Sequence, residues 1–224
     1  MTFSLVARCA TTGMFGVAIS SSSPAVAARC AYAQAGTGAV ASQNVTDPRL
    51  GPRALRLLAE GADARQTVEI LARTAPHAEY RQVLVVDAGG AAAVHSGGKA
   101  LGIWSHAIGP DVAAGGNMLA DASVPQAMVD GFAAATGHLG DRLLAALRAG
   151  LARGGEAGPV HSAGLRIVGV QDWPLADLRC DWTEACPIEA LATLWDRYKP
   201  QMDAYVTRAL DPSAAPSYGV PGDR

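Results

Sequence analysis

The sequence has few charges and few aromatic residues. Charged residues make up 17% of the 224 positions, aromatic residues 5%, and the formal net charge is −2. Without a basic excess, the chain has no electrostatic footprint for nucleic acid or an anionic membrane surface. It also has no apolar run of the ~20 residues that a membrane-spanning helix needs, and no basic and apolar leader. We therefore expect a soluble, cytoplasmic protein with no nucleic-acid and no membrane partner.

Patterns that bind metals and cofactors are missing as well. The four cysteines have no CxxC spacing, which argues against a zinc site and against a disulfide framework, and the histidines lack metal-ligand spacing. The segment Gly36–Ala41 matches G-x-G-x-x-A, but no helix opens there. Gly97–Ala100 lacks the upstream glycine and the Ser/Thr of a phosphate loop. The sequence predicts no metal and no cofactor.

Strand patterns and helix patterns alternate in groups along the chain. Strands are predicted at Phe3–Arg8, Phe15–Ser20, Val26–Tyr32, Thr37–Gln43, Gln82–Asp87, Ala91–Ser96, Ile103–Ile108, Val112–Gly115, Ser162–Val170 and Leu175–Cys180. Helices are predicted from Pro52 to Gly61, from an Asp63 cap to Pro76, at Val124–Ala135 and at Leu139–Arg153. We expect residues 103–115 to extend the hairpin formed by residues 82–96.

This order of elements is not the βαβ rhythm of a doubly wound parallel sheet. It fits an α+β fold, a four-layer αββα sandwich in which two mainly antiparallel sheets pack face to face and helices flank them. Strands rich in Ala, Gly and Val suit such a core, because they are buried on both faces.

The C-terminal part of the chain has a different composition. Pro187–Leu210 carries apolar residues at helical spacing, with Pro200 expected to kink or split the helix, and Asp211–Arg224 is a Pro/Ser/Gly-rich tail. We expect an αββα domain over 1–182 and a helical arm with its tail over 183–224. The apolar and aromatic arm is expected to dock onto the body or onto a second subunit, in a homodimer.

Thr2 is the sharpest candidate for a catalytic residue. Threonine directly after the initiator Met1 favours removal of the methionine, which would give Thr2 a free α-amine. With a pKa near 8, part of this amine is neutral at pH 7 and can act as base for the neighbouring hydroxyl. Many proteins begin Met-Thr without any catalytic role, so this start needs support from the rest of the chain.

That support comes from a resemblance that covers nearly the whole chain. Matching segments are Thr2–Arg8, Gly16–Ala18, Ala35–Gln43, Gly51–Arg53, Tyr80–Gln82, Ala114–Asn117, His161–Leu165, Tyr205–Pro212 and Gly219–Asp223. They resemble the bacterial domain of unknown function 1028, in the superfamily of N-terminal-nucleophile (Ntn) hydrolases. The resemblance implies hydrolysis of an amide bond through an acyl-enzyme on Thr2. Many relatives have an acidic residue where this chain has Cys9, and a basic loop where it has Gly155–Gly158. A substrate-contacting charge from that loop would therefore be missing here.

Amide hydrolysis needs donors aimed at the developing oxyanion. Gln43 and Asn44 end a predicted central strand, where a sandwich opens into a site. The Asn44 amide and the backbone N–H groups of Gly36–Ala39 are the candidate donors, and Gln43 is a candidate substrate contact. A simpler interpretation is that Asn44 and Asp47 only form a turn before Pro48.

Four further polar residues are candidate substrate contacts. Ser22 and Ser23 follow the first hairpin and could hold the Thr2 amine or a substrate carboxylate, although a plain polar loop explains them equally well. Asn117 ends a Gly-Gly-Asn run, which is typical of a close backbone approach or of a helix cap. Ser162 starts a strand, and its neighbour His161 must point to the opposite face, which argues against a Ser–His pair.

Cys30 is the rival nucleophile, because Arg29 beside it could stabilise a thiolate, whereas most isolated cysteines are core residues. Three hypotheses stay open. The first is an amidohydrolase acting on a small-molecule amide through Thr2. The second is a non-catalytic metabolite-binding or structural oligomer that retains Met1. The third is a hydrolase that depends on Cys30.

Overall fold

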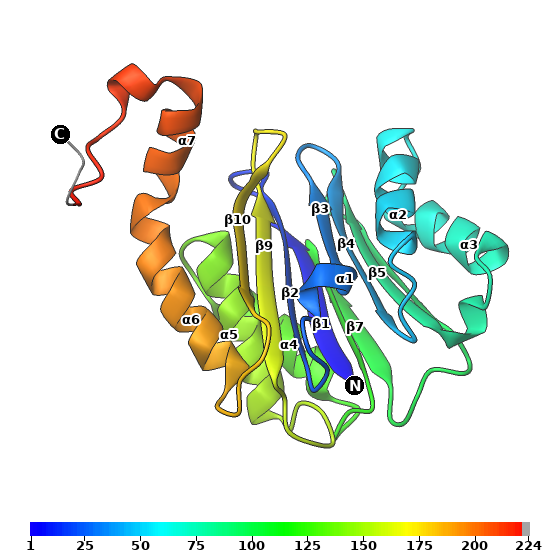
Figure 1. Cartoon of the computed structure of the whole chain (residues 1–224). Helices are drawn as coiled ribbons and strands as arrows, with labels where there is room; N and C mark the ends of the chain where they lie inside the picture. The colour runs from blue at the N-terminus through cyan, green and yellow to red at the C-terminus, as the bar shows by residue number, and fades with distance from the viewer. Residues whose placement is uncertain (221–224) are drawn as a thin grey trace.

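The computed structural model describes residues 1–220, in which two antiparallel sheets carry helices on their outer faces (Figure 1). The larger sheet has the strand order β10 (Pro174–Cys180), β9 (Ser162–Val168), β2 (Phe15–Ser21), β1 (Thr2–Arg8), β8 (Val112–Asn117) and β7 (Ser105–Gly109). The smaller sheet has the order β3 (Ala31–Gln34), β4 (Gly38–Asn44), β5 (Arg81–Asp87) and β6 (Ala92–Ser96). The predicted α+β class with two antiparallel sheets is confirmed.

Seven α-helices are present in the described residues: α1 (Ala27–Cys30), α2 (Leu50–Ala59), α3 (Ala64–Thr74), α4 (Val124–Ala134), α5 (Leu139–Ala152), α6 (Pro187–Tyr198) and α7 (Met202–Leu210). Short 3₁₀ turns lie at Ala78–Tyr80, Lys199–Gln201 and Pro212–Ala214. Helices α2 and α3 pack on the smaller sheet, and α4, α5 and α6 pack on the larger one. No helix among residues 1–220 is both long and apolar enough to cross a membrane.

The core consists of three apolar clusters, and β1 contributes to two of them. Phe3, Leu5 and Ala7 face α4 and α5, whereas Val6 faces the smaller sheet together with Ile19 of β2. A strand buried on both faces has no polar side to alternate with its apolar one, which explains the weak alternation of these strands in the sequence.

Two predicted strand assignments are wrong. Residues 27–30 of the predicted strand Val26–Tyr32 form the single-turn helix α1, and the strand starts only at Ala31. Ala27 rests on β9 at Gly164, where an added Cβ would lie 2.2 Å from the Ala27 Cβ. Strands β7 and β8 do not extend the β5–β6 hairpin. They join the larger sheet, where β8 pairs with β1.

The predicted C-terminal helical pattern is split at Pro200 into α6 and α7, and α6 packs onto the body. Trp195 of α6 is buried against Gly140 of α5, where an added Cβ would lie 2.4 Å from the indole ring. The indole N–H donates a hydrogen bond of 2.8 Å to Asp141. Residues 221–224 of the predicted tail, including part of the matching segment 219–223, lie outside the described residues.

Candidate functional site

Four buried polar side chains form a row across the end of the larger sheet. Pairing between β8, β1, β2 and β9 sets Asn117 opposite Thr2 and Ser21 opposite Ser162, and the hydroxyl oxygens of Thr2 and Ser21 lie 3.3 Å apart. Paired residues on neighbouring strands share one face of a sheet. This face looks toward the smaller sheet, because Ser4, two residues along β1 from Thr2, hydrogen-bonds Gln43 of β4. We call these four residues the Thr2 row.

The hydroxyl groups at the centre of the Thr2 row surround the Met1–Thr2 peptide bond. The Met1 carbonyl oxygen accepts a hydrogen bond from the Thr2 hydroxyl and another, of 2.5 Å, from Ser21. Ser21 Oγ also lies 2.7 Å from Ser23 Oγ. The bond that must be cut to give Thr2 a free amine therefore lies inside a cluster of hydroxyl groups.

One member of the row has an unused hydrogen-bond donor. Asn117 is 1% exposed, and its side-chain Nδ2 has no hydrogen-bond partner among the described residues. A buried donor without a partner costs on the order of 1–3 kcal/mol, and such groups in native proteins call for an explanation. On the strand next to Thr2, this amide can donate to a bound oxygen.

Ser162 and Ser23 fix the loop that follows β2. Ser162 Oγ donates to the Ser23 carbonyl oxygen over 2.6 Å and lies 3.3 Å from the backbone N of Val26, which donates to it. Ser162 is fully buried and holds the loop in place. The structure thus brings the predicted residues Thr2, Asn117, Ser162 and Ser23 together, and adds Ser21, which the sequence argument passed over within a run of four serines.

Glu156 is the second residue that the sequence argument missed. Its carboxylate accepts the backbone N–H of Ser22 at 3.1 Å from each oxygen, and the residue is 3% exposed. Burial raises the pKa of this carboxyl from 4.5 to about 7, opposed by the positive charge of the Met1 α-amino group, the Ser22 hydrogen bonds and His161. The loop expected to bring no charge to the site therefore supplies an acidic one.

A signal for Glu156 was present in the sequence. It is a lone acidic residue among Gly155, Ala157 and Gly158, in a chain with few charges. Its place in the fold depends on a contact that sequence patterns do not reveal: an isolated bridge between Glu156 and Leu119, just after β8, holds the loop beside the row.

The predicted substrate contact Gln43 lies behind the row and faces inward. It is fully buried, accepts from Ser4 (2.6 Å), and donates to Gln82 (2.8 Å) and to the Gly115 carbonyl (3.2 Å). Gln82 in turn donates to Ser96 Oγ at 3.0 Å. With both N–H groups engaged inside the protein, Gln43 joins the two sheets and forms a floor for the site.

The two predicted oxyanion donors on β4 are not brought to Thr2. The Asn44 amide donates to the Tyr80 carbonyl at 2.5 Å, and its oxygen accepts from the Leu101 N–H at 3.3 Å. The segment Gly36–Ala39 lies at the other end of β4, since Gly38 pairs with Asp87 whereas Gln43 pairs with Gln82. On the strand beside Thr2, the side chain that pairs with it is Asn117 rather than either of these donors.

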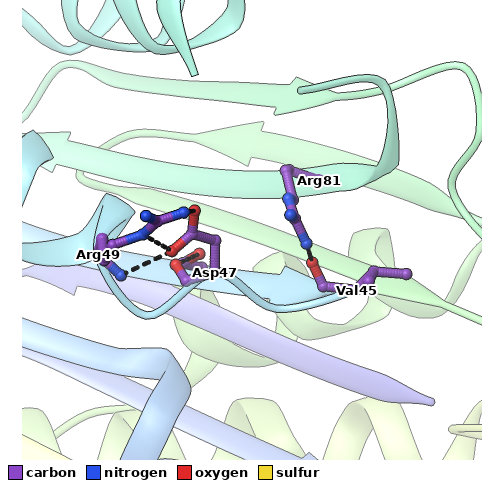
Figure 2. Close-up of polar contacts among 5 residues, drawn as sticks. Val45, Asp47, Arg49 and Arg81 are labelled. Atoms are coloured by element: carbon purple, nitrogen blue, oxygen red, sulfur yellow. Dashed lines mark hydrogen bonds and ion pairs between the residues drawn. The ribbon is translucent and has the colours of Figure 1, made fainter. Parts of the chain in front are cut away.

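The connection from Asn44 to α2 is stabilised by Asp47 and Arg49, whereas the Asn44 side chain bonds to Tyr80 and Leu101. Figure 2 shows the buried Asp47 carboxylate accepting hydrogen bonds from the guanidinium of Arg49 at 2.8 Å and from its backbone N–H at 3.1 Å, while Arg81 donates to the Val45 carbonyl. The hydrogen bonds from Arg49 hold the pKa of Asp47 below its usual value. This turn leads β4 into α2.

Cys30 is a poor nucleophile in this fold. It is 1% exposed within the apolar cluster between the sheets, and its sulfur lies 3.6 Å from Thr46 Oγ1. Burial raises the pKa of the thiol, which disfavours the reactive thiolate. Within residues 1–220, no group of three His, Cys, Asp or Glu residues is arranged to hold a metal ion.

Comparison with known proteins gives a family and similar solved structures. The model of a family of unknown function, DUF1028, matches residues 2–191. The crystal structure of protein SPO2555 from Silicibacter pomeroyi, assigned to the same family, is 30% identical, with a TM-score of 0.81 and 88% of each chain covered. Anbu (ancestral beta-subunit) from Yersinia bercovieri overlays 91% of this chain and 97% of its own at 9% identity, with a TM-score of 0.41, too low to establish a shared fold. No curated protein matches the chain.

Proposed function

The chain belongs to DUF1028, a family of unknown function, and within it we propose that this protein is an Ntn-type amidohydrolase that cleaves a small-molecule amide through Thr2. One observation carries the proposal. Buried Thr2 sits between Ser21 and Asn117, and within residues 1–220 the Asn117 amide has a donor with no hydrogen-bond partner. A nucleophile, a group to orient it and a donor for an oxyanion are thereby held on three adjacent strands.

The arrangement of layers supports the same proposal. Helices α2 and α3, the two sheets, and helices α4 and α5 follow one another as in an αββα sandwich, and β1 lies inside the larger sheet rather than at its edge. A nucleophile at the start of an interior strand is held rigidly by neighbours on both sides. Such rigid placement is what positioning and electrostatic catalysis require.

The proposed reaction starts with removal of Met1. The Thr2 α-amine then takes the proton of Oγ1 as that oxygen attacks the substrate carbonyl carbon. Asn117 Nδ2 donates a hydrogen bond to the negatively charged oxygen of the tetrahedral intermediate. The proton passes from the amine to the leaving nitrogen as the C–N bond breaks. A water molecule, deprotonated by the same amine, then attacks the Thr2 ester. The bond between the acyl carbon and Oγ1 breaks, the amine returns the proton to Oγ1, and the acid is released.

Ser21 and Ser23 orient the nucleophile in this mechanism. With Met1 removed, Ser21 Oγ loses the carbonyl that it now contacts at 2.5 Å and becomes available to the new amine beside it. Ser23 Oγ, 2.7 Å from Ser21 Oγ, fixes the direction of the Ser21 hydroxyl.

The test is a screen of small amides with matched variants. We expect the processed protein to hydrolyse at least one amide, Thr2→Ala to abolish this activity, and Thr2→Ser to retain part of it, because serine keeps both the amine and a hydroxyl. Cys30→Ala is the control and should keep wild-type activity. Activity that survives in Thr2→Ala, or that disappears in Cys30→Ala, would overturn the proposal.

A further inference from the structure

Met1 shows what kind of acyl group the site can surround. Its carbonyl oxygen accepts hydrogen bonds from Thr2 and Ser21. Its side chain reaches Gly158, where an added Cβ would lie 3.6 Å from the methionine methyl group. Its α-amino group lies near enough to Glu156 for its charge to act on that carboxyl. A methionyl group thus contacts the nucleophile at its carbonyl and faces an acidic residue with its amine.

The charges around the site favour a cation over an anion. In the part of the chain that the structure describes, no lysine or arginine side chain hydrogen-bonds or ion-pairs with the Thr2 row or with Glu156. A substrate carboxylate would therefore find no fixed cation there. Glu156 is 3% exposed and has no ion-pair partner among these residues. A buried carboxylate without a cation is costly, and a bound ammonium group would remove that cost.

Glu156 also has hydrogen-bonding capacity left for a ligand. An ionised carboxylate offers about four acceptor positions, and Ser22 is the one residue of the described chain that donates hydrogen bonds to it. Because Ser22 follows Ser21 directly, the end of β2 fixes the acidic group and the nucleophile relative to one another.

We propose that the site takes amides whose acyl part carries an α-ammonium group, such as amino-acid amides and the first residue of short peptides, with Glu156 as the acceptor of that ammonium. This substrate class rests on the proposed function. The ammonium takes no part in bond breaking. It orients the acyl carbonyl toward Thr2 Oγ1, and the C–N bond is cleaved as described above.

The kinetic test compares L-methionine p-nitroanilide with its N-acetyl derivative. We expect kcat/KM to be at least tenfold higher for the free amine in the wild-type protein, and this ratio to fall to about one in Glu156→Gln. The matched control is Glu184→Gln, which removes an acidic group that is 80% exposed and should keep the wild-type ratio. A wild-type ratio near or below one, or a ratio unchanged in Glu156→Gln, would overturn the assignment.

A binding test separates this inference from the proposed chemistry. In calorimetric titrations, L-methioninamide should bind at least tenfold more tightly than N-acetyl-L-methioninamide, and Glu156→Gln should remove the difference. If this preference is present but no amide is hydrolysed, the proposed function fails and ammonium recognition stands. If the preference is absent, the inference fails whatever the turnover.

Discussion

Asn117 and Glu156 are buried polar side chains whose hydrogen bonds and neighbouring charges do not fully offset the cost of burying them. Among the residues that the structure describes, the amide nitrogen of Asn117 has no hydrogen-bond partner, and the carboxyl of Glu156 has a pKa raised by burial to about 7. Both lie beside Thr2 or beside the loop that adjoins it. Groups that cost stability and lie close together are expected at a functional site, because burial that lowers stability can serve catalysis or binding, and here they lie around the proposed nucleophile.

Asn117→Leu should separate stability from activity. Leucine has the same branched shape as asparagine, is somewhat larger, and removes an unpaired polar group, so the free energy of unfolding should stay within about 1 kcal/mol of wild type or rise. Loss of an oxyanion donor should lower kcat by about 10²-fold. Urea unfolding and steady-state kinetics on one preparation check both results. A large loss of stability with unchanged kcat would show that the amide has a structural role.

Glu156→Gln should change how stability depends on pH. The raised pKa means that the folded protein binds more protons than the unfolded chain between pH 4.5 and about 7, so the wild type loses stability as the pH rises through this window. The variant should match the wild type below pH 4.5 and exceed it above pH 7 by on the order of 3 kcal/mol. Denaturation at pH 4 and at pH 8 tests this, and an equal difference at both would contradict it.

At the scale of elements, the floor of the site depends on a network of hydrogen bonds that joins the two sheets. Gln82 of β5 is fully buried and touches Gln43, Ser96 and the Gly116 carbonyl. Gln82→Leu should lower the free energy of unfolding by about 2–4 kcal/mol, because it leaves several buried polar groups without partners. Gln126→Leu, on the exposed face of α4, is the control and should change it by less than about 0.5 kcal/mol.

Local signals in the sequence predicted most individual elements correctly. Asp63 was expected to cap a helix, and it caps α3 in a capping box with Gln66. The pattern 26–32 was misread because it is rich in alanine, a good helix former, so its β-branched and aromatic ends were weak evidence for a strand. The pairing of β7 and β8 with the larger sheet was also not predicted, because strand pairing depends on long-range register rather than on local sequence pattern.

The same limit applies to the site. Thr2 and Asn117 carry local signals, an N-terminal threonine and a Gly-Gly-Asn run. Thr2 lies opposite Asn117 because of the pairing register between β1 and β8, and only the folded structure reveals that register. Glu156 is held beside the row by its bridge to Leu119 and by the Ser22 N–H, and no periodicity of the sequence indicates either contact.

At the scale of the whole molecule, α6 packs on the body through several buried residues, and the closest approach is that of Trp195 to Gly140. Gly140 leaves room for the Trp195 ring, so Gly140→Ala should destabilise the protein by about 1–3 kcal/mol, although alanine favours a helix. Gly98→Ala is the control, because an added Cβ there meets nothing within 4 Å. Tryptophan fluorescence during urea unfolding measures the free energy of unfolding of both variants. Equal stability of the two variants would contradict this account of the contact.

The outer side of the arm supports the proposal that the protein is a homodimer. Leu194, Tyr205 and Leu210 are 39%, 40% and 59% exposed on α6 and α7. Sedimentation equilibrium should show a dimer, and a charge in this surface, such as Leu210→Glu, should shift it toward the monomer. A monomeric wild type would exclude this arrangement.

The central claim is that Thr2 acts through a free α-amine, and the most direct measurement is the intact mass of the protein expressed without an N-terminal tag. The account predicts the mass of the chain lacking one methionine. A mass that retains Met1 would leave the Thr2 nitrogen in a peptide bond, remove the base from the mechanism, and contradict the assignment of Thr2 as nucleophile.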